Sequence, residues 1–385
     1  MFARHIAANA LTLIGVLTFA GVGVVAWGKK QYTTPGPLAQ AICLRVEGGS
    51  DMGDVADSLE AQNAISSRAI FSAGTQYSGR SHMLKAGSFL VPSSASMADI
   101  NEVVTGNGRS TCGTEINYRI GILRAKLEVN ELDPETNRYV EVLSFNPAED
   151  EVPAAYTEVR DDPSVRYRIT MAEGITSWQI VDALRSADFL AGEVEEIPAE
   201  GTLAPLGEDV RVGMDRNALL AQMTQKQSEI LAEAWQNRAN GLPYETPEEA
   251  LIMASIIEKE TGVSSERAQV ASVFVNRLNQ GIRLQTDPTV IYGITKGQGA
   301  LGRGLRQSEL RSDTPWNTYV IDALPPTPIA NPGQAAIEAA LNPDDTDYIF
   351  FVADGSGGHA FARTLQEHNA NVVKWREIEA QRASE

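Results

Sequence analysis

The stretch that decides the fold is TPEEALIMASIIEKETG, residues 246–262. Thr246 can cap a helix, Pro247 suits the first helical position, and Glu249 completes a Thr-x-x-Glu capping box. A run of apolar residues follows and leads to three charged ones. Gly262 then stands where a helix commonly ends. The pattern predicts an apolar helix that carries its charged side chains at its carboxyl end.

Two glutamates near the end of this helix are two residues apart and therefore point to different faces. Glu258 counts back at helical spacing to a mild face, whereas Glu260 counts back to the most apolar stripe, made of Ile257, Ile256, Met253 and Ile252. Loss of hydration and the helix C-terminus should both raise the pKa of Glu260. Such a carboxyl group suits a general acid. Alternatively, Glu260 pairs with Arg267 or Arg277 and serves only packing.

Further helices are expected on both sides of this one. The patterns predict helices at 176–185 and 215–240 upstream, and a helix at 266–280 that Ser264 or Ser265 caps and Gly281 closes. The polar segment 283–293 is predicted to form a turn that begins at Asp287 and Pro288.

The chain before residue 195 has a different character. A strand at 41–46, helices at 52–62 and 66–72, and a strand at 86–92 form a small strand–helix–helix–strand unit, with another helix at 96–104. Between 110 and 168, alternating patterns predict strands joined by acidic turns. The expected class is α+β, and the expected organisation is as follows: an N-terminus with its anchor at 1–30, a linker at 31–40, the small domain at 41–109, a β-rich connecting region at 110–194, and a catalytic domain at 195–385.

The first residues predict a membrane anchor. The run from Ile6 to Trp27 carries no charge and is long enough to cross a bilayer. A cleaved signal peptide is the competing interpretation, but Trp27 followed by Lys29 and Lys30 is unlike a cleavage site of small residues. The positive-inside rule does not decide the orientation, because basic residues flank both ends.

Composition excludes some functions. The formal net charge of −18 argues against a nucleic-acid-binding protein. The four histidines and two cysteines have no zinc-site spacing, so no metal is expected. Cys43 and Cys112 either form a disulfide, as in an oxidising compartment, or remain two buried thiols.

Several segments resemble, in order, the MltG (YceG-like) endolytic murein transglycosylase family. An upstream segment, 200–205, also matches the beginning of a family stretch, and the main matches are Met253-Ala254-Ser255-Ile256-Ile257-Glu258-Lys259-Glu260-Thr261, Val270-Ala271-Ser272-Val273-Phe274-Val275-Asn276-Arg277-Leu278, Arg283-Leu284-Gln285-Thr286-Asp287-Pro288-Thr289-Val290-Ile291-Tyr292-Gly293, Thr314-Pro315-Trp316-Asn317-Thr318-Tyr319, Leu324-Pro325-Pro326-Thr327-Pro328-Ile329 and Gly357-Gly358-His359-Ala360-Phe361.

The resemblance implies a single-pass protein of the inner (cytoplasmic) membrane, with a LysM-like domain at 41–109 and a mixed α/β YceG-like catalytic domain in the periplasm. It implies that Glu260 is the catalytic acid and base that cuts the glycan strands of peptidoglycan, leaving 1,6-anhydro ends. Peptidoglycan synthases are candidate partners. No cofactor is expected, and no second carboxylate is required, because the attacking hydroxyl belongs to the substrate and its effective molarity is high.

Nine polar residues are candidates for holding sugars or stabilising developing charge, although each alone is more often structural: Glu200, Asn276, Arg277, Gln285, Thr286, Asp287, Tyr292, Asn317 and Tyr319. Two other functions stay open. A lysozyme-like hydrolase would pair Glu260 with a second carboxylate, for which Asp287, Glu200 and Glu258 are available. A peptidoglycan-binding scaffold without catalysis would need none of them.

Overall fold

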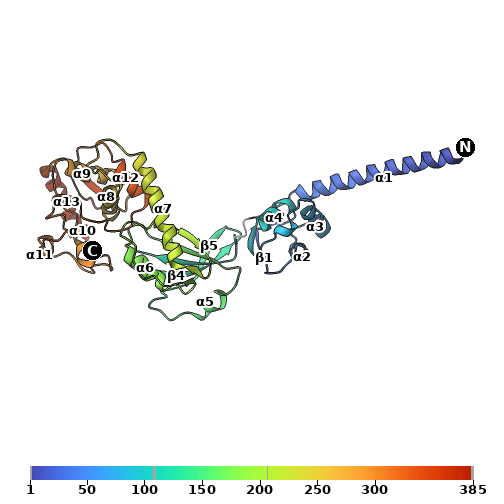
Figure 1. The fold of residues 1–385 in the computed structure, drawn as a ribbon, viewed down its shortest axis with the longest axis horizontal. Coiled ribbons are helices and arrows are strands. Elements are labelled where there is room, and N and C mark those ends of the chain that lie inside the picture. The colour runs from blue at the N-terminus through green and yellow to red at the C-terminus, as the bar shows by residue number, and fades with distance from the viewer. Residues whose placement is uncertain (1, 107–109, 206, 383–385) are drawn as a thin grey trace. The chain divides into compact units, whose positions relative to one another are not determined.

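The computed structural model describes residues 2–106, 110–205 and 207–382, with side chains from residue 13 onward (Figure 1). Its helices and strands confirm the α+β class. The chain forms two compact units. One consists of 1–117, 128–145 and 151–167, and the other of 118–127, 146–150 and 168–385.

Helix α1 (Phe2–Thr33) begins the first unit. Its segment Leu13–Thr33 is long and apolar enough to cross a membrane, a test that a signal sequence passes as well. The helix extends into the predicted linker, and the rest of that linker packs on the small domain. Leu38 is 6% exposed, and the amide of Gly36 donates to the carbonyl of Ser94 at 3.2 Å.

The small domain follows the predicted strand–helix–helix–strand order. It comprises β1 (Ile42–Val46), α2 (Met52–Ala61), α3 (Arg68–Tyr77), the 3-10 turn η1 (Ser81–Met83), β2 (Gly87–Val91) and α4 (Met97–Val104). Strands β1 and β2 are antiparallel, with Ile42 opposite Val91. Cys43 is disulfide-bonded to Cys112, with 5.6 Å between their Cα atoms, which settles the alternative in favour of the disulfide.

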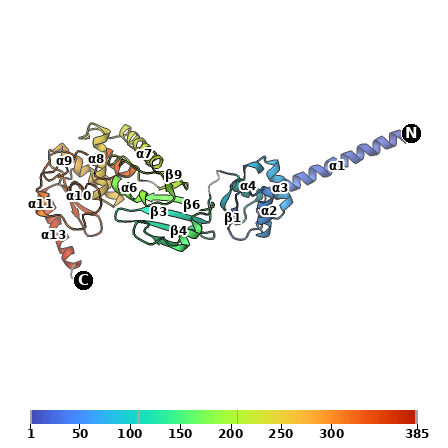
Figure 2. The same ribbon diagram turned by 60° about the horizontal axis from the view of Figure 1, so that its bottom comes forward.

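The predicted strands between 110 and 168 are present. They are β3 (Thr114–Ile120), β4 (Ala125–Asp133), β5 (Arg138–Phe145) and β6 (Arg166–Met171), with the short helix α5 (Ala154–Val159) before β6. Together with β8 (Gly207–Val210) they form a sheet in the order β5-β4-β3-β6-β8. Figure 2 labels its strands β3, β4 and β6. The acidic turn between β4 and β5 holds Asn137 at a φ of 52°, a left-handed conformation that asparagine tolerates.

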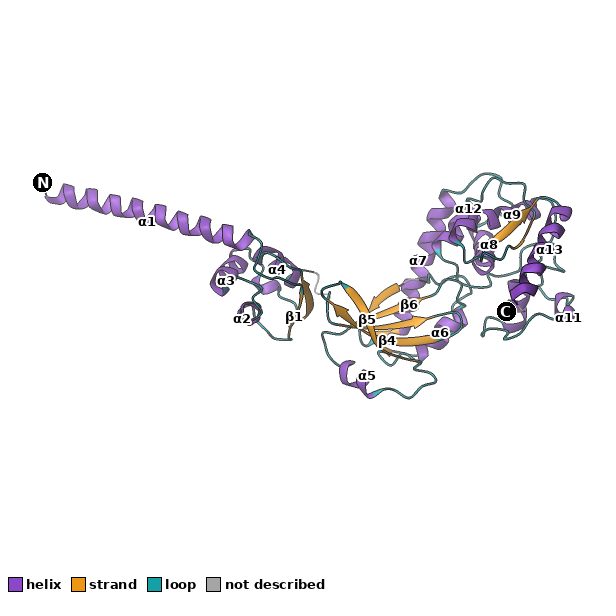
Figure 3. Cartoon of the chain, turned by 180° about the vertical axis from the view of Figure 1, so that it is seen from behind, coloured by secondary structure: helices purple, strands orange, loops and turns teal. Residues whose placement is uncertain are grey.

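The second unit is mostly helical in its carboxyl part (Figure 3). Its remaining elements are α6 (Ser177–Arg185), β7 (Leu190–Ala191), β9 (Met214–Asp215), α7 (Arg216–Gln236), α8 (Pro247–Glu260), η2 (Ser264–Glu266), α9 (Arg267–Asn279), α10 (Asp287–Thr295), α11 (Gln307–Leu310), α12 (Gln334–Leu341), β10 (Phe350–Ala353), β11 (His359–Ala362) and α13 (Leu365–Arg382).

Helix α8 is the centre of this unit, and α7, α9, α10 and α12 pack around it (Figure 1). Every residue from 250 to 257 is buried, and all of them are apolar except Ser255. The Ser255 hydroxyl is satisfied by the carbonyl of Ile252 at 2.7 Å and the amide of Ile329 at 3.0 Å. Each large apolar side chain buried here stabilises the fold by about 1.5–3 kcal/mol. The stripes that lead to Glu258 and Glu260 are therefore both buried, although only the one behind Glu260 consists entirely of large apolar side chains.

Several predicted helix ends differ from the structure. Thr246 caps α8 as expected, but the carboxylate of Glu249 accepts from the amide of Glu245 at 2.7 Å, so the capping box is not formed. Thr261 ends the helix in an extended conformation, and Gly262 does not take the positive φ of a glycine cap.

The region after α8 also differs from the prediction. Ser264 and Ser265 lie in η2 and do not cap α9, whose N-cap is Glu266. Gly281, with a φ of 67°, does close α9. The predicted turn at 283–293 is wrong from Asp287 onward, because Asp287 and Pro288 begin α10, where proline is well tolerated in the first turn.

Candidate active site

The three charged residues at the end of α8 reach three different partners. Glu258 Oε2 accepts a hydrogen bond from the amide of Gly333 at 3.0 Å, and Lys259 Nζ donates to the carbonyl of Gly174 at 3.2 Å. Glu260 Oε1 accepts a hydrogen bond from the hydroxyl of Thr286. Glu258 and Lys259 thus hold neighbouring loops against α8. Within the described part of the chain, the carboxylate of Glu260 has one hydrogen-bond partner, the Thr286 hydroxyl.

Burial raises the pKa of Glu260, and the nearby carboxylate of Asp287 raises it further. The Thr286 hydroxyl and the side chain of His359 act in the opposite direction. The predicted direction of the shift is confirmed, and its main cause is loss of hydration. Among the residues that the structure describes, neither Arg267 nor Arg277 forms an ion pair with Glu260, so the packing-only alternative lacks its proposed partner.

Glu260 lines a cavity of about 630 Å³, a size suited to a small ligand or a few sugar units. The cavity wall is partly aromatic and aliphatic and partly polar, and its residues are Glu260, Val273, Phe274, Arg277, Leu284, Gln285, Thr286, Asp287, Tyr319, Phe350, Phe351, Val352, Leu365, His368 and Asn369. Five of the nine residues predicted to bind substrate are in this wall: Arg277, Gln285, Thr286, Asp287 and Tyr319.

Asp287 is the other carboxylate of the cavity. Its Oδ1 accepts a hydrogen bond from the Tyr319 hydroxyl at 2.6 Å. Burial raises the pKa of Tyr319, and the neighbouring carboxylate adds to the effect. The phenol is therefore protonated at neutral pH and remains a donor to Asp287.

Arg277 and Gln285 shape the cavity through the backbone. Arg277 donates to the carbonyls of Leu284 and Ile349, both at 2.7 Å, and so ties α9 to the segments on either side of it. Gln285 has a φ of 53°, and its amide donates to the carbonyl of Thr318 at 3.1 Å. This left-handed residue lies immediately before Thr286, the hydrogen-bond donor to Glu260.

Glu200 and Tyr292 belong to a separate network. Glu200 accepts from the amide of Ser177 at 2.8 Å, from the Tyr292 hydroxyl at 3.2 Å and from the amide group of Asn331 at 3.4 Å. Burial raises the pKa of Glu200. The network joins α6, α10 and the loop before α12, and neither Glu200 nor Tyr292 lines the Glu260 cavity.

Asn276 and Asn317 are outside the cavity wall as well. The side chain of Asn276 donates to the carbonyls of Thr346 and Tyr348 at 2.7 and 2.9 Å. The side chain of Asn317 is fully buried and donates to three carbonyls in the segment before it, the shortest bond being 2.7 Å to Ser312. Asn276 thus holds the segment before β10, and Asn317 holds the loop that leads to Tyr319 of the cavity wall.

The cavity also includes residues that were not predicted. Phe350 and Phe351 come from β10, and His368 and Asn369 from α13. A pair of adjacent aromatics before the Gly-rich turn, and a histidine next to an asparagine, were the available signals. Neither shows in the sequence which surface it will face.

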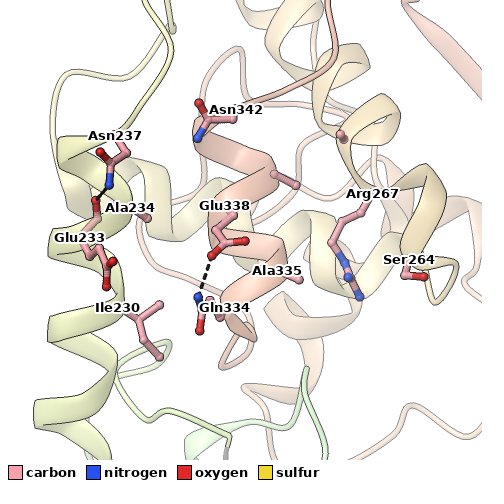
Figure 4. A pocket seen from close by; sticks show the side chains of 12 residues that line it. Ile230, Glu233, Ala234, Asn237, Ser264, Arg267, Gln334, Ala335, Glu338 and Asn342 are labelled. Carbon is pink, nitrogen blue, oxygen red and sulfur yellow. Dashed lines mark hydrogen bonds between the residues drawn. The ribbon is translucent and has the colours of Figure 1, made fainter.

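A second cavity of about 450 Å³ is lined by parts of α7, η2, α9 and α12 (Figure 4). Glu233 of α7 and Asn237, the residue that caps the end of that helix, line it. Gln334 and Glu338 of α12 are hydrogen-bonded to each other at 2.7 Å. None of the ten predicted site residues lines it. The predicted site residues that gather around one cavity are therefore Glu260 and five of the nine others, and that cavity is the Glu260 cavity.

Comparisons with known proteins place these residues in a family. Three relatives carry the name endolytic murein transglycosylase. One from Bacillus subtilis is 46% identical over 125 residues, which are 32% of this chain and 34% of that protein. Two from Streptococcus pneumoniae are 29% identical over 196 residues (strain R6; 49% of this chain and 32% of that protein) and 34% identical over 135 residues (strain D39; 34% and 24%). The chain thus matches about a third or less of the length of these relatives.

A crystal structure of a yceG-like protein from Listeria monocytogenes aligns with 86% of this chain and 99% of its own, at 24% identity and a TM-score of 0.46. The YceG-like family itself matches residues 146–374, which is more than half of the chain and includes Glu260 and every residue of its cavity. The chain belongs to the YceG-like family.

Proposed function

We propose that this chain is a peptidoglycan lytic transglycosylase in which Glu260 acts first as acid and then as base. The observation that carries the proposal is a carboxyl group with a raised pKa in a sugar-sized cavity, held by one hydroxyl and free of ion pairs with the described residues. The names of the three relatives support the same reaction.

In the proposed reaction, protonated Glu260 donates its proton to the oxygen that links N-acetylmuramic acid to N-acetylglucosamine. The resulting carboxylate then removes the proton from the 6-hydroxyl of the muramic residue, whose oxygen attacks the anomeric carbon and closes the 1,6-anhydro ring. A raised pKa favours the acid form needed for the first step. The attacking group belongs to the same sugar, so its effective concentration is high and a second catalytic carboxylate is not required.

Lysozyme-like hydrolysis is the second candidate, and the position of Asp287 favours it. Asp287 lines the same cavity and interacts electrostatically with Glu260, as a nucleophilic or water-activating carboxylate would. Glu258 and Glu200 are weaker partners, because both are engaged by backbone amides outside that cavity.

The proposal extends to the rest of the chain. The segment from Ile6 to Trp27 would anchor the protein in the cytoplasmic membrane, the small domain at 41–109 would be a LysM-like glycan-binding module, and the region 195–385 would act in the periplasm, with 110–194 connecting the two. Its substrate would be nascent glycan strands, and synthases of those strands would be its partners. The disulfide is compatible with this compartment.

Digestion of purified sacculi tests the reaction. The full-length chain is expected to release fragments with 1,6-anhydro ends, each one water lighter than a hydrolytic product with a reducing end. Glu260→Gln should abolish their release, whereas Glu338→Gln, which changes a carboxylate in the other cavity, should not. Reducing ends in place of anhydro ends would support hydrolysis, and full activity of Glu260→Gln would support a scaffold.

A further inference from the structure

The first turn of α13 forms part of the wall of the Glu260 cavity. Leu365, His368 and Asn369 are spaced by three and four residues, so they share one face of the helix, and all three line the cavity. Leu365 is 59% exposed although it is large and apolar. This helix was not anticipated from the sequence, and no part of the proposed mechanism uses it.

His368 is held in a defined orientation by an aromatic neighbour. Its ring stacks on Phe350 of β10, with 5.0 Å between the ring centroids and 20° between the ring planes. The Arg277 guanidinium lies over the same phenylalanine, 5.3 Å from its centroid. Phe350 therefore contacts both His368, in the first turn of α13, and Arg277, which donates to the carbonyl of Leu284 in the loop before Thr286.

The imidazole has an unused hydrogen-bonding atom. Nδ1 of His368 is buried and has no partner among the residues that the structure describes. A buried polar atom of this kind destabilises a fold by about 1–3 kcal/mol unless another group satisfies it. Burial, together with the positive charge of Arg277, lowers the pKa of His368, so the ring is uncharged at neutral pH. A neutral imidazole offers one donor and one acceptor.

We propose that His368 and Asn369 form a sugar subsite of the Glu260 cavity, in which they bind the hydroxyl or N-acetyl groups of an N-acetylhexosamine residue of the glycan strand. This inference rests on the proposed function, because it takes its ligand class from that reaction. An uncharged sugar carries many donors and acceptors and no net charge at these groups. Neutral side chains such as imidazole and carboxamide match it, and the exposed Leu365 can cover an apolar face of the ring.

A purely structural role for His368 is the alternative, in which the ring only stacks on Phe350. The variant His368→Phe separates the two, because it keeps an aromatic ring in that place and removes both nitrogens. Removal of an unsatisfied buried nitrogen should leave the thermal midpoint equal or higher. His368→Ala, which also removes the stack, serves as the structural comparison, and Gln366→Ala, on the same helix but outside the cavity wall, is the matched control for Asn369→Ala.

Binding is measured without cleavage. The full-length Glu260→Gln chain in detergent is titrated with peptide-free glycan strands, alone and combined with each α13 variant. Because a neutral hydrogen bond contributes modestly, His368→Phe and Asn369→Ala should each raise the Kd about three- to tenfold, and Gln366→Ala should leave it unchanged. In the active chain the same two variants should raise KM more than they lower kcat.

Unchanged strand affinity in the His368→Phe variant, with an unaltered fold, would overturn the subsite. The same conclusion would follow if His368→Phe lowered the thermal midpoint as much as His368→Ala does. Failure of the proposed function would look different, since the parent chain would then release no anhydro ends while the binding results could still be obtained.

Discussion

Thr286 donates a hydrogen bond from its hydroxyl to Oε1 of Glu260, and the next residue, Asp287, places a carboxylate in the same cavity. The two neighbours shift the pKa of Glu260 in opposite directions. The hydroxyl stabilises the charged form, and the carboxylate destabilises it. Two consecutive residues at the start of α10 therefore shift the pKa of Glu260, one downward and one upward.

Thr286→Val should raise the pKa of Glu260, because it removes the hydrogen bond to the carboxylate. If the protonated acid is required, kcat/KM falls as pH rises through that pKa. The alkaline limb of the profile should therefore move to higher pH, with a loss at the optimum of about tenfold. The rate at which anhydro fragments are released across a pH series measures both the position of the limb and the loss at the optimum. Thr157→Val, the same change at an exposed position, is the control, and an unmoved limb would contradict this role of Thr286.

Asp287→Asn should have the opposite effect on the profile. Removing the negative charge lowers the pKa of Glu260, so the alkaline limb should move to lower pH. Transglycosylation should survive with a loss of no more than about a hundredfold, whereas removal of a second catalytic carboxylate typically costs on the order of 10⁴-fold. A loss of that larger size, together with reducing ends in the parent digest, would favour hydrolysis.

Glu260→Gln should stabilise the protein at neutral pH while it abolishes cleavage. The folded-state pKa of Glu260 is raised, so the native state binds more protons than the unfolded state between the two pKa values. Stability from this group is therefore lost as pH rises through that window, and the neutral amide avoids the loss. Each kcal/mol gained in the free energy of unfolding should raise the thermal midpoint by about 2–4 °C in a protein of this size.

The pH dependence provides the control for that comparison. Below the unfolded-state pKa the carboxyl group is protonated in both states, so the difference in midpoint between Glu260→Gln and the parent chain should vanish there. A midpoint that drops by the same amount at every pH would instead indicate damage to packing.

Reduction of the Cys43–Cys112 disulfide should destabilise the first unit. The bond joins residues separated by 69 positions, and a loop of that length corresponds to about 4 kcal/mol in the chain-entropy description. The double variant Cys43→Ser/Cys112→Ser should lower the denaturant midpoint of the small domain. Limited proteolysis within 41–106 at increasing denaturant concentration measures this midpoint. Equal protease resistance with and without the bond would contradict the expectation.

Removal of residues 1–33 should convert a membrane-bound chain into a soluble one. The candidate span is exposed and mainly apolar up to Trp27, and a helix of this kind is stable in a bilayer core. After cell fractionation, the full-length chain should stay with the membrane pellet through an alkaline wash, and the truncated chain should not. A full-length gene that yields a soluble product beginning after Trp27 would indicate a cleaved signal sequence instead.

The sequence allowed the elements of the core to be predicted because their signals are local. Periodicity and capping place α7, α8 and α9 within a few residues, and the apolar length of α8 anticipates its burial. Glu260 was predicted to be the acid from its place on that helix and from the family resemblance. Its raised pKa followed from the same argument, although burial on every side of α8 is what produces it.

Pairings between distant segments could not be predicted. The bond between Thr286 and Glu260 joins residues 26 positions apart, and the contact of Glu200 with Tyr292 spans 92. Only the folded chain shows that the first pair belongs to the cavity and the second braces a different set of loops. Helix α13 has no buried residue and little amphipathic pattern, so nothing local predicts that its first turn lines the cavity.

The position of that turn affects how the protein is made. Leu365, His368 and Asn369 follow every other wall residue in the chain, so a ribosome must pass residue 369 before the cavity can close. A nascent or prematurely terminated product would already contain Glu260 yet lack one side of the cavity around it. Truncation before Leu365 would therefore leave the Glu260 cavity open on one side, although these two residues are 105 positions apart in the chain.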